Sequence, residues 1–248
     1  MKIENTESVC LAGEKEKRKG KLLISIRNVG VIYNRNRSIF KKKRFEALKD
    51  VSFDIFSGES IGVIGRNGAG KSTLMTLISG IIKPDRGEVI NYGASVSLLA
   101  LQAGFMNELS GRDNMVLSGL ALGFPKKKLE EKLDEIISFS GIGGRIDDAV
   151  RTYSAGMRAR LGFSIAHILN PDILLVDETL GVGDRAFRQK SANAMREKIK
   201  SEQTVVLVSH NSNTIRDLCD RAVWLEKGIV MASGEVDTVL KAYEKKVL

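Results

Sequence analysis

The apolar positions of this chain fall into short continuous runs and into stretches with helical spacing. Continuous runs are typical of strands covered on both faces, and they occur at 60–64, 173–176, 204–208 and 222–225. Further strands are predicted over 22–31 and 47–55, and a helix over 71–81. The middle, about 106–165, is predicted to be helical, with Leu129, Leu133, Ile136 and Ile137 on one face of a helix over 126–139. This order of elements predicts an α/β core with a helical insertion.

The net charge of +9 is confined to the beginning of the chain. Residues 1–49 hold 14 Lys and Arg against 5 Asp and Glu, whereas residues 50–248 hold 25 against 25. Residues 1–21 are charged and almost without large apolar side chains, so we expect a flexible extension there. A basic loop is expected over 34–44, where the sequence is NRNRSIFKKKR.

Composition excludes several classes of protein. No stretch approaches the roughly 18 to 20 apolar residues that span a bilayer, and the first 20 residues lack the apolar core of a signal peptide. The two cysteines, Cys10 and Cys219, are too few for a disulfide framework or a four-thiolate zinc site. We therefore expect a cytosolic globular protein.

A phosphate-binding loop is predicted between the strand over 60–64 and the helix that follows it. The residues from Gly65 to Ser72, GRNGAGKS, match G-x-x-x-x-G-K-[ST] in the strand–helix context that the motif requires. The glycines allow consecutive backbone N–H groups to face an anion, and the helix N-terminus adds its positive dipole. Lys71 is expected to reach the β- and γ-phosphates, and the Ser72 hydroxyl to bind Mg²⁺.

Polar residues follow two other predicted strands at the edge where ligands bind in open α/β sheets. Asp177 and Glu178 come directly after the run 173–176, about 105 residues beyond the phosphate loop. Asp177 is predicted to bind Mg²⁺ through its oxygens, and Glu178 to polarise the attacking water as the catalytic base. His210 follows the strand over 204–208 and is predicted to contact the γ-phosphate. His167, within a helical run, is interpreted as structural.

Together these motifs resemble the ABC-type ATPases over residues 22 to about 245. The segment YSAGM, from Tyr153 to Met157, stands about 20 residues before the acidic pair, in the place of the family's LSGGQ signature. YSAGM followed by an arginine-rich helix, together with ALKDVSF at 47–53 and GFMNELSGRDN at 104–114, resembles the ATPase subunits that export O-antigen, capsular polysaccharide or teichoic acid.

The resemblance implies a P-loop ABC-type ATPase core with a mixed sheet, an antiparallel β subdomain and an inserted helical subdomain. It implies that ATP and Mg²⁺ are the cofactors, that Glu178, His210 and Gln102 are catalytic, and that Ser72, Gln102 and Asp177 hold the metal. The nucleotide-binding residues that it implies are Tyr33, Gly65, Asn67, Gly68, Ala69, Gly70, Lys71, Ser72, Thr73, Ser154, Ala155, Gly156 and Asp184.

Two of these roles have alternatives. Tyr33 matches the aromatic residue that stacks on adenine, but it could pack on the sheet instead, with Phe40 and Phe45 as rival platforms. Gln102 is the best match to the Q-loop glutamine, although its distance to Glu108 is about one residue shorter than in typical importers. It could instead be an exposed glutamine at a strand end.

The resemblance also implies partners. ATP is expected between two copies of the chain, and a permease with two copies in the membrane is expected near 102–114, at the cytoplasmic face of the inner membrane. The cargo is then a lipid-linked polysaccharide, and no nucleic acid is involved. No C-terminal carbohydrate-binding domain is expected, since the sequence ends at Leu248.

Alternatives to polysaccharide export are a generic importer ATPase, disfavoured by YSAGM, and an ABC ATPase that acts on nucleic acid. The latter is disfavoured because the two nucleotide motifs are not separated by a coiled coil or zinc cysteines, and because the chain carries one cassette. The basic residues 41–44 are expected to form a solvated loop, or else to contact anionic lipid headgroups or the permease.

Overall fold

The computed structural model describes residues 20–36, 42–99, 105–177 and 183–247. Its described residues divide into two units, which are treated separately: unit 1 comprises residues up to Tyr92 and from Leu207 onward, and unit 2 comprises 93–206. Of the predicted site residues, Gln102 and Glu178 lie outside the described residues, as does almost all of the extension over 1–21.

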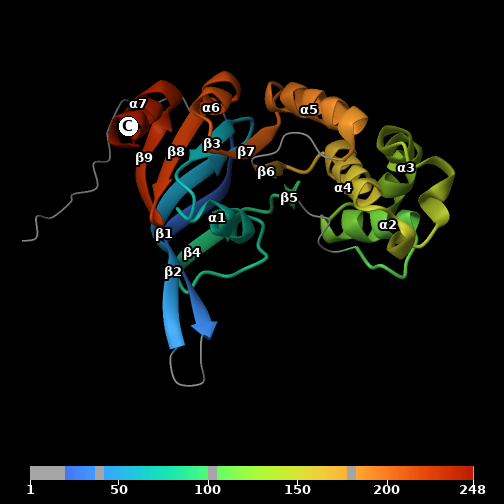
Figure 1. The fold of residues 1–248 in the computed structure, drawn as a ribbon, viewed down its shortest axis with the longest axis horizontal. Helices are drawn as coiled ribbons and strands as arrows, with labels where there is room; N and C mark the ends of the chain where they lie inside the picture. The colour runs from blue at the N-terminus through green and yellow to red at the C-terminus, as the bar shows by residue number, and fades with distance from the viewer. Residues whose placement is uncertain (1–19, 37–41, 100–104, 178–182, 248) are drawn as a thin grey trace, which may run out of the picture. The chain divides into compact units, whose positions relative to one another are not determined.

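Unit 1 contains most of the sheet (Figure 1). Its strands are β1 (Leu22–Asn36), β2 (Lys42–Phe56), β3 (Ser60–Ile64), β4 (Arg86–Asn91), β8 (Arg221–Glu226) and β9 (Ile229–Glu235). Their order is β4-β1-β2-β9-β8-β3. Pairs β1–β2, β1–β4 and β8–β9 are antiparallel, whereas β2–β9 and β3–β8 are parallel. The mixed sheet with an antiparallel part is therefore confirmed.

The helices of unit 1 are α1 (Lys71–Ile78), α6 (Ser212–Leu218) and α7 (Val236–Val247). The helix predicted over 71–81 ends at Ile78, and Gly80 then adopts φ 74°, a conformation that glycine tolerates and that stops the helix. α6 and α7 pack against β3 and β8. Together these elements form an apolar cluster consisting of Ile64, Ile215, Ala222, Trp224, Val236, Val239, Leu240 and Tyr243.

Within the basic loop expected over 34–44, residues 34–36 and 42–44 are strand, so the prediction is wrong for them, and 37–41 lie outside the described residues. β1 continues to Asn36 and β2 begins at Lys42, and their pairing runs outward to Asn36↔Lys42. Beyond Gly30 the described pairs of β1 are with β2, so the two strands form a ribbon (Figure 1). A two-stranded ribbon needs no buried face along its length, which is why the sequence shows no apolar period there.

Unit 2 is mainly helical. Its elements are β5 (Val96–Leu98), α2 (Gly111–Ala121), α3 (Lys126–Ser140), η1 (Gly143–Asp147), η2 (Val150–Thr152), α4 (Ala155–Leu169), β6 (Ile173–Asp177) and α5 (Arg185–Ile199). β5 pairs in parallel with β6, and β7 (Thr204–Ser209) crosses the division between the units. The predicted helix over 126–139 is α3, in which Leu129 and Ile136 are fully buried. No described helix is both long and apolar enough to cross a membrane.

Candidate nucleotide-binding site

The phosphate loop follows β3, whose five residues are all buried. At Gly65 an added Cβ would lie 2.1 Å from the Leu225 carbonyl oxygen of β8, so only glycine allows this approach. Gly68 and Gly70 have φ values of 80° and 108°, which side-chain-bearing residues rarely adopt. The sequence GxxxxG is therefore required by the shape of the loop itself.

Lys71 is the first residue of α1 and is buried. Its ammonium group donates hydrogen bonds to the carbonyl oxygens of Gly65 (2.7 Å) and Arg66 (3.2 Å), at the start of the loop. The side chain thus folds back across the loop and places one positive charge inside it. Because Gly70 precedes the helix and has no side chain, it offers no cap to the first-turn N–H groups of α1, which suits an anion.

The loop is held from outside by the turn between β8 and β9. Lys227 and Gly228 have φ values of 48° and 80°, as in a two-residue type I′ hairpin turn. Gly228 donates its N–H to the Ala69 carbonyl (2.9 Å), and its own carbonyl accepts from Lys49 N–H of β2 (2.8 Å). A Cβ on Gly228 would lie 2.7 Å from the Ala47 carbonyl oxygen. Gly228 therefore joins the phosphate loop to β2, a role that its sequence context did not reveal.

Tyr33 and Phe45 face each other across the β1–β2 ribbon. Directly opposite residues of an antiparallel pair point to the same face, and these two side chains are 41% and 44% exposed. The two side chains therefore share one face of the ribbon, while Phe40 lies outside the described residues, and the choice of Tyr33 as the adenine platform stays a prediction. Phe45 is two residues, or about 7 Å along the strand, from Ala47. The carbonyl oxygen of Ala47 would lie 2.7 Å from a Cβ added to Gly70 of the phosphate loop.

The other residues predicted in unit 1 are Asn67, Ser72, Thr73 and His210. Asn67 and Ser72 are exposed and Thr73 is half-buried, all within the loop and the first turn of α1. His210 is exposed and follows β7 directly. Asp177 is the last residue of β6 and belongs to unit 2, so its predicted role in binding the metal together with Ser72 stays a prediction.

The signature segment of unit 2 begins α4. Ser154 caps the helix by accepting a hydrogen bond from Met157 N–H (3.2 Å), and Ser154 and Ala155 are exposed. Tyr153 is buried, and its hydroxyl donates to the Arg145 carbonyl (2.6 Å). Burial raises the pKa of the Tyr153 hydroxyl, so it stays a donor. The motif is thus anchored by Tyr153 and presents its small residues to solvent.

Arg158 and Arg160, the arginines after the signature, have separate contacts. Arg158 donates from Nε (3.3 Å) and Nη2 (3.2 Å) to the Tyr153 carbonyl. Arg160 approaches Asp184, with 3.6 Å between Nη1 and Oδ2. Asp184 also caps α5 by accepting from Phe187 N–H (3.0 Å). The predicted nucleotide-binding role of Asp184 stays a prediction.

Asn114 of α2 is the last residue of the segment 104–114, which resembles the export ATPases in sequence. Its structural role was not predicted. It is buried, and its amide bonds to both the N–H (2.7 Å) and the carbonyl (3.0 Å) of Met106. It also donates to the carbonyls of Leu109 (3.3 Å) and Ser110 (2.9 Å). One side chain therefore shapes the segment 106–110. No signal in a single sequence distinguishes it from an exposed helical asparagine.

His167 lies in α4 in contact with the rings of Phe139 and Phe163, at centroid distances of 4.9 and 5.7 Å. Burial, with a smaller contribution from the positive charge of Lys198, lowers its pKa to about 4. Nδ1 is buried and has no hydrogen-bond partner among the described residues. These contacts agree with the interpretation of His167 as structural.

Stability is expected to fall as the pH falls from about 6.5 to about 4, because between these values the unfolded chain binds the His167 proton and the folded chain does not. For this half-buried group the loss should be about 1–2 kcal/mol. Urea unfolding at pH 7 and pH 4.5 would measure it. The replacement His167→Phe should remove the loss of stability that His167 causes between pH 7 and pH 4.5. An unchanged pH dependence in this variant would contradict a lowered pKa of His167 in the folded chain.

Comparison with known proteins places these features in one family. The model of the ABC transporter family matches residues 48–181, more than half of the chain. The chain belongs to the ABC transporter family. It is 48% identical over 206 residues to the teichoic acids export ATP-binding protein TagH of Lactococcus lactis, covering 83% of this chain and 44% of that protein. It is 41% identical over 207 residues to the O-antigen export system ATP-binding protein RfbB of Klebsiella pneumoniae, covering 84% of each.

Solved structures of ABC transporter proteins share the fold. An ATP-binding cassette in a dimeric post-hydrolysis state, bound to ADP and Pi, matches with a TM-score of 0.66 and 22% identity, covering 86% of this chain and 99% of that one. The predicted family resemblance and fold class are thus confirmed. The match spans less than half of the TagH sequence, so relatives of this family include much longer chains.

Proposed function

We propose that this chain is the ATP-hydrolysing subunit of an ABC exporter that moves a lipid-linked polysaccharide across the cytoplasmic membrane. The main support is the identity of 41–48% to ATP-binding proteins of teichoic acid and O-antigen export over more than four fifths of this chain. The complete phosphate loop, with Lys71 folded into it, supports ATP as the substrate.

ATP binding is assigned to unit 1. The triphosphate lies against the loop N–H groups and the first turn of α1, with Lys71 neutralising phosphate charge. Tyr33, with Phe45 beside it, stacks on the adenine ring. Ser72 and Asp177 offer hydroxyl and carboxylate oxygens, the donors that Mg²⁺ prefers. The metal, when bound, neutralises charge that develops on the phosphates.

Hydrolysis is assigned to a dimer of the chain. Ser154, Ala155 and Gly156 of one copy face the phosphates bound by Lys71 of the other, and the exposed, uncharged start of α4 supports this. Glu178 takes a proton from the attacking water, and His210 and Gln102 contact the γ-phosphate. Hydrolysis removes the phosphate that joins the two copies, so ATP turnover opens and closes the dimer.

The permease is assigned to the segment around 102–114 and to α2, which begins in that segment. Met106, Leu117 and Leu120 are 56%, 42% and 47% exposed, and Leu117 and Leu120 share a helix face at i, i+3 spacing. Exposed apolar residues grouped in this way are typical of protein interfaces. We therefore place the chain at the cytoplasmic face of the membrane, bound to two permease subunits.

The double replacement Leu117→Glu and Leu120→Glu is expected to reduce co-purification with the permease at least about tenfold, because it places two charges in an apolar contact. The measurement is the amount of chain retained on a tagged permease in detergent. ATP hydrolysis by the isolated chain should stay within about twofold, since both side chains are exposed. Lys127→Glu, on the exposed part of α3, is the matched control and should be retained as wild type. Full retention of the double variant would place the permease elsewhere.

A further inference from the structure

The short helix α6 starts two residues after His210 and is fixed by its neighbours. A helix of seven residues is not stable in isolation, so its position depends on tertiary contacts. One contact is apolar: Ile215 is fully buried against β3, where a Cβ added to Gly62 would lie 2.4 Å from Ile215 Cγ2. Through Ile215, α6 rests on the strand that leads into the phosphate loop.

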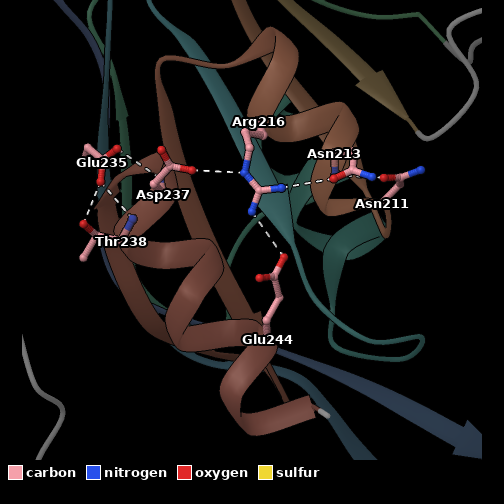
Figure 2. A network of polar contacts seen from close by, with 7 residues as sticks. All are labelled: Asn211, Asn213, Arg216, Glu235, Asp237, Thr238 and Glu244. Carbon is pink, nitrogen blue, oxygen red and sulfur yellow. Dashed lines mark hydrogen bonds and ion pairs between the residues drawn. The ribbon is translucent and has the colours of Figure 1, made fainter.

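The second contact is polar and is made by Arg216 (Figure 2). Its Nε donates to Asp237 Oδ1 (3.0 Å) at the start of α7, and its Nη2 donates to Glu244 Oε1 (3.4 Å) two turns further along α7. Its Nη1 donates to Asn213 Oδ1 (3.1 Å) in the first turn of α6. One guanidinium group therefore joins two turns of α7 to the beginning of α6.

The first turn of α6 is bonded to Asn211, and Asn211 is bonded to Ser209, on the other side of His210. Asn211 Oδ1 accepts from Asn213 N–H (2.9 Å) and Thr214 N–H (3.3 Å). The N–H of Asn211 donates to the hydroxyl of Ser209 (3.0 Å), which is buried at the end of β7. The backbone at His210 is thus held between β7 and the capped start of α6.

α7 is itself held in place by polar contacts at its start and by apolar packing. The Glu235 carboxylate accepts from Asp237 N–H (3.1 Å), Thr238 N–H (2.8 Å) and the Thr238 hydroxyl (2.6 Å), which fixes the residue that Arg216 contacts (Figure 2). On its apolar side, Leu240 and other residues of α7 pack in the cluster that includes Ile64, the last residue of β3.

We propose that Arg216 is a positioning residue for ATP hydrolysis: it ties α6 to α7 and thereby holds His210 at a fixed place relative to the phosphate loop. The inference rests on the proposed function, in which His210 contacts the γ-phosphate. Arg216 acts through Asn213 and Asn211 and touches no substrate. α7 is thus coupled to His210 through Arg216. Displacing α7 would therefore slow hydrolysis without removing any ATP contact.

The test uses the full chain with Mg-ATP. Arg216→Met keeps the aliphatic stem and removes the guanidinium, and we expect kcat to fall about 5- to 20-fold with KM for ATP within about twofold. Arg216→Lys keeps one of the contacts and should recover most of the rate. Combining Arg216→Met with Asp237→Asn should lower kcat little further, because both changes break the same link.

Lys132→Met is the matched control, since it removes another exposed pair of a basic side chain with a carboxylate, that with Glu135 of α3 (2.7 Å). Exposed pairs contribute little to stability, so all of these variants should fold. A wild-type kcat for Arg216→Met, or an equal loss in Lys132→Met, would overturn the inference. His210→Ala separates the two proposals. If His210→Ala is inactive and Arg216→Met is normal, only this inference fails, whereas full activity of His210→Ala overturns both assignments.

Discussion

Replacing Lys71 with alanine is expected to lower the rate of ATP hydrolysis at least about 100-fold, or ~2.7 kcal/mol of transition-state stabilisation. The buried ammonium group is bonded to two carbonyls of the phosphate loop. Its loss removes the positive charge that faces the phosphates and also leaves those carbonyls without this donor. Steady-state release of phosphate at saturating Mg-ATP measures the effect.

Lys83→Ala is a suitable control, because Lys83 is an exposed lysine of the same unit. It should hydrolyse ATP at the wild-type rate. If Lys71→Ala retained more than about half of the wild-type rate while remaining folded by circular dichroism, the phosphate loop would not be the ATP site.

The replacement Glu178→Gln is expected to trap an ATP-bound dimer with hydrolysis lowered by about 100- to 10,000-fold, the usual contribution of a general base. The amide keeps the shape of the carboxylate and cannot take a proton from water. ATP would then remain between the two copies, and gel filtration in Mg-ATP should show a species of twice the 27.2 kDa of the single chain.

The exposed Glu202 provides the control, and Glu202→Gln should hydrolyse ATP normally and stay monomeric after turnover. Wild-type turnover by Glu178→Gln would refute its role as the base. A monomer that binds ATP without hydrolysing it would instead leave the base in place and refute the dimer.

Sequence patterns were sufficient where the chemistry is local. β3, the phosphate loop and α1 follow one another within about 20 residues, and glycine spacing, buried β-strand and helix start are all visible in that segment. The helical face of α3 was likewise predicted, because Leu129 and Ile136 recur at helical spacing and are buried in the structure.

Prediction failed where the structure of a segment depends on residues elsewhere in the chain. The charged stretch 34–44 lacks an apolar face, yet its described residues belong to the β1–β2 ribbon, because backbone pairing with the opposite strand needs no apolar period. Within this ribbon, Tyr33 and Phe45 become neighbours only through the register. Sequence alone had treated them as alternatives.

The same holds for residues that act through distant partners. Gly228 contacts the phosphate loop about 160 residues earlier in the chain, and Arg216 reaches Glu244 in the last helix. Neither belongs to a motif, and an isolated glycine or arginine has too many uses for its role to be read from one sequence. Tertiary hydrogen bonds supply that information.

The most direct test of the central proposal is surface display of the polysaccharide. The chain and its permease would be expressed together in cells that make the lipid-linked polymer but lack their own export ATPase, and polymer on intact cells would be measured by antibody or lectin binding. We predict surface polymer with wild type and with Lys83→Ala, and polymer retained inside the cell with Lys71→Ala. Equal surface polymer with wild type and Lys71→Ala would contradict the account.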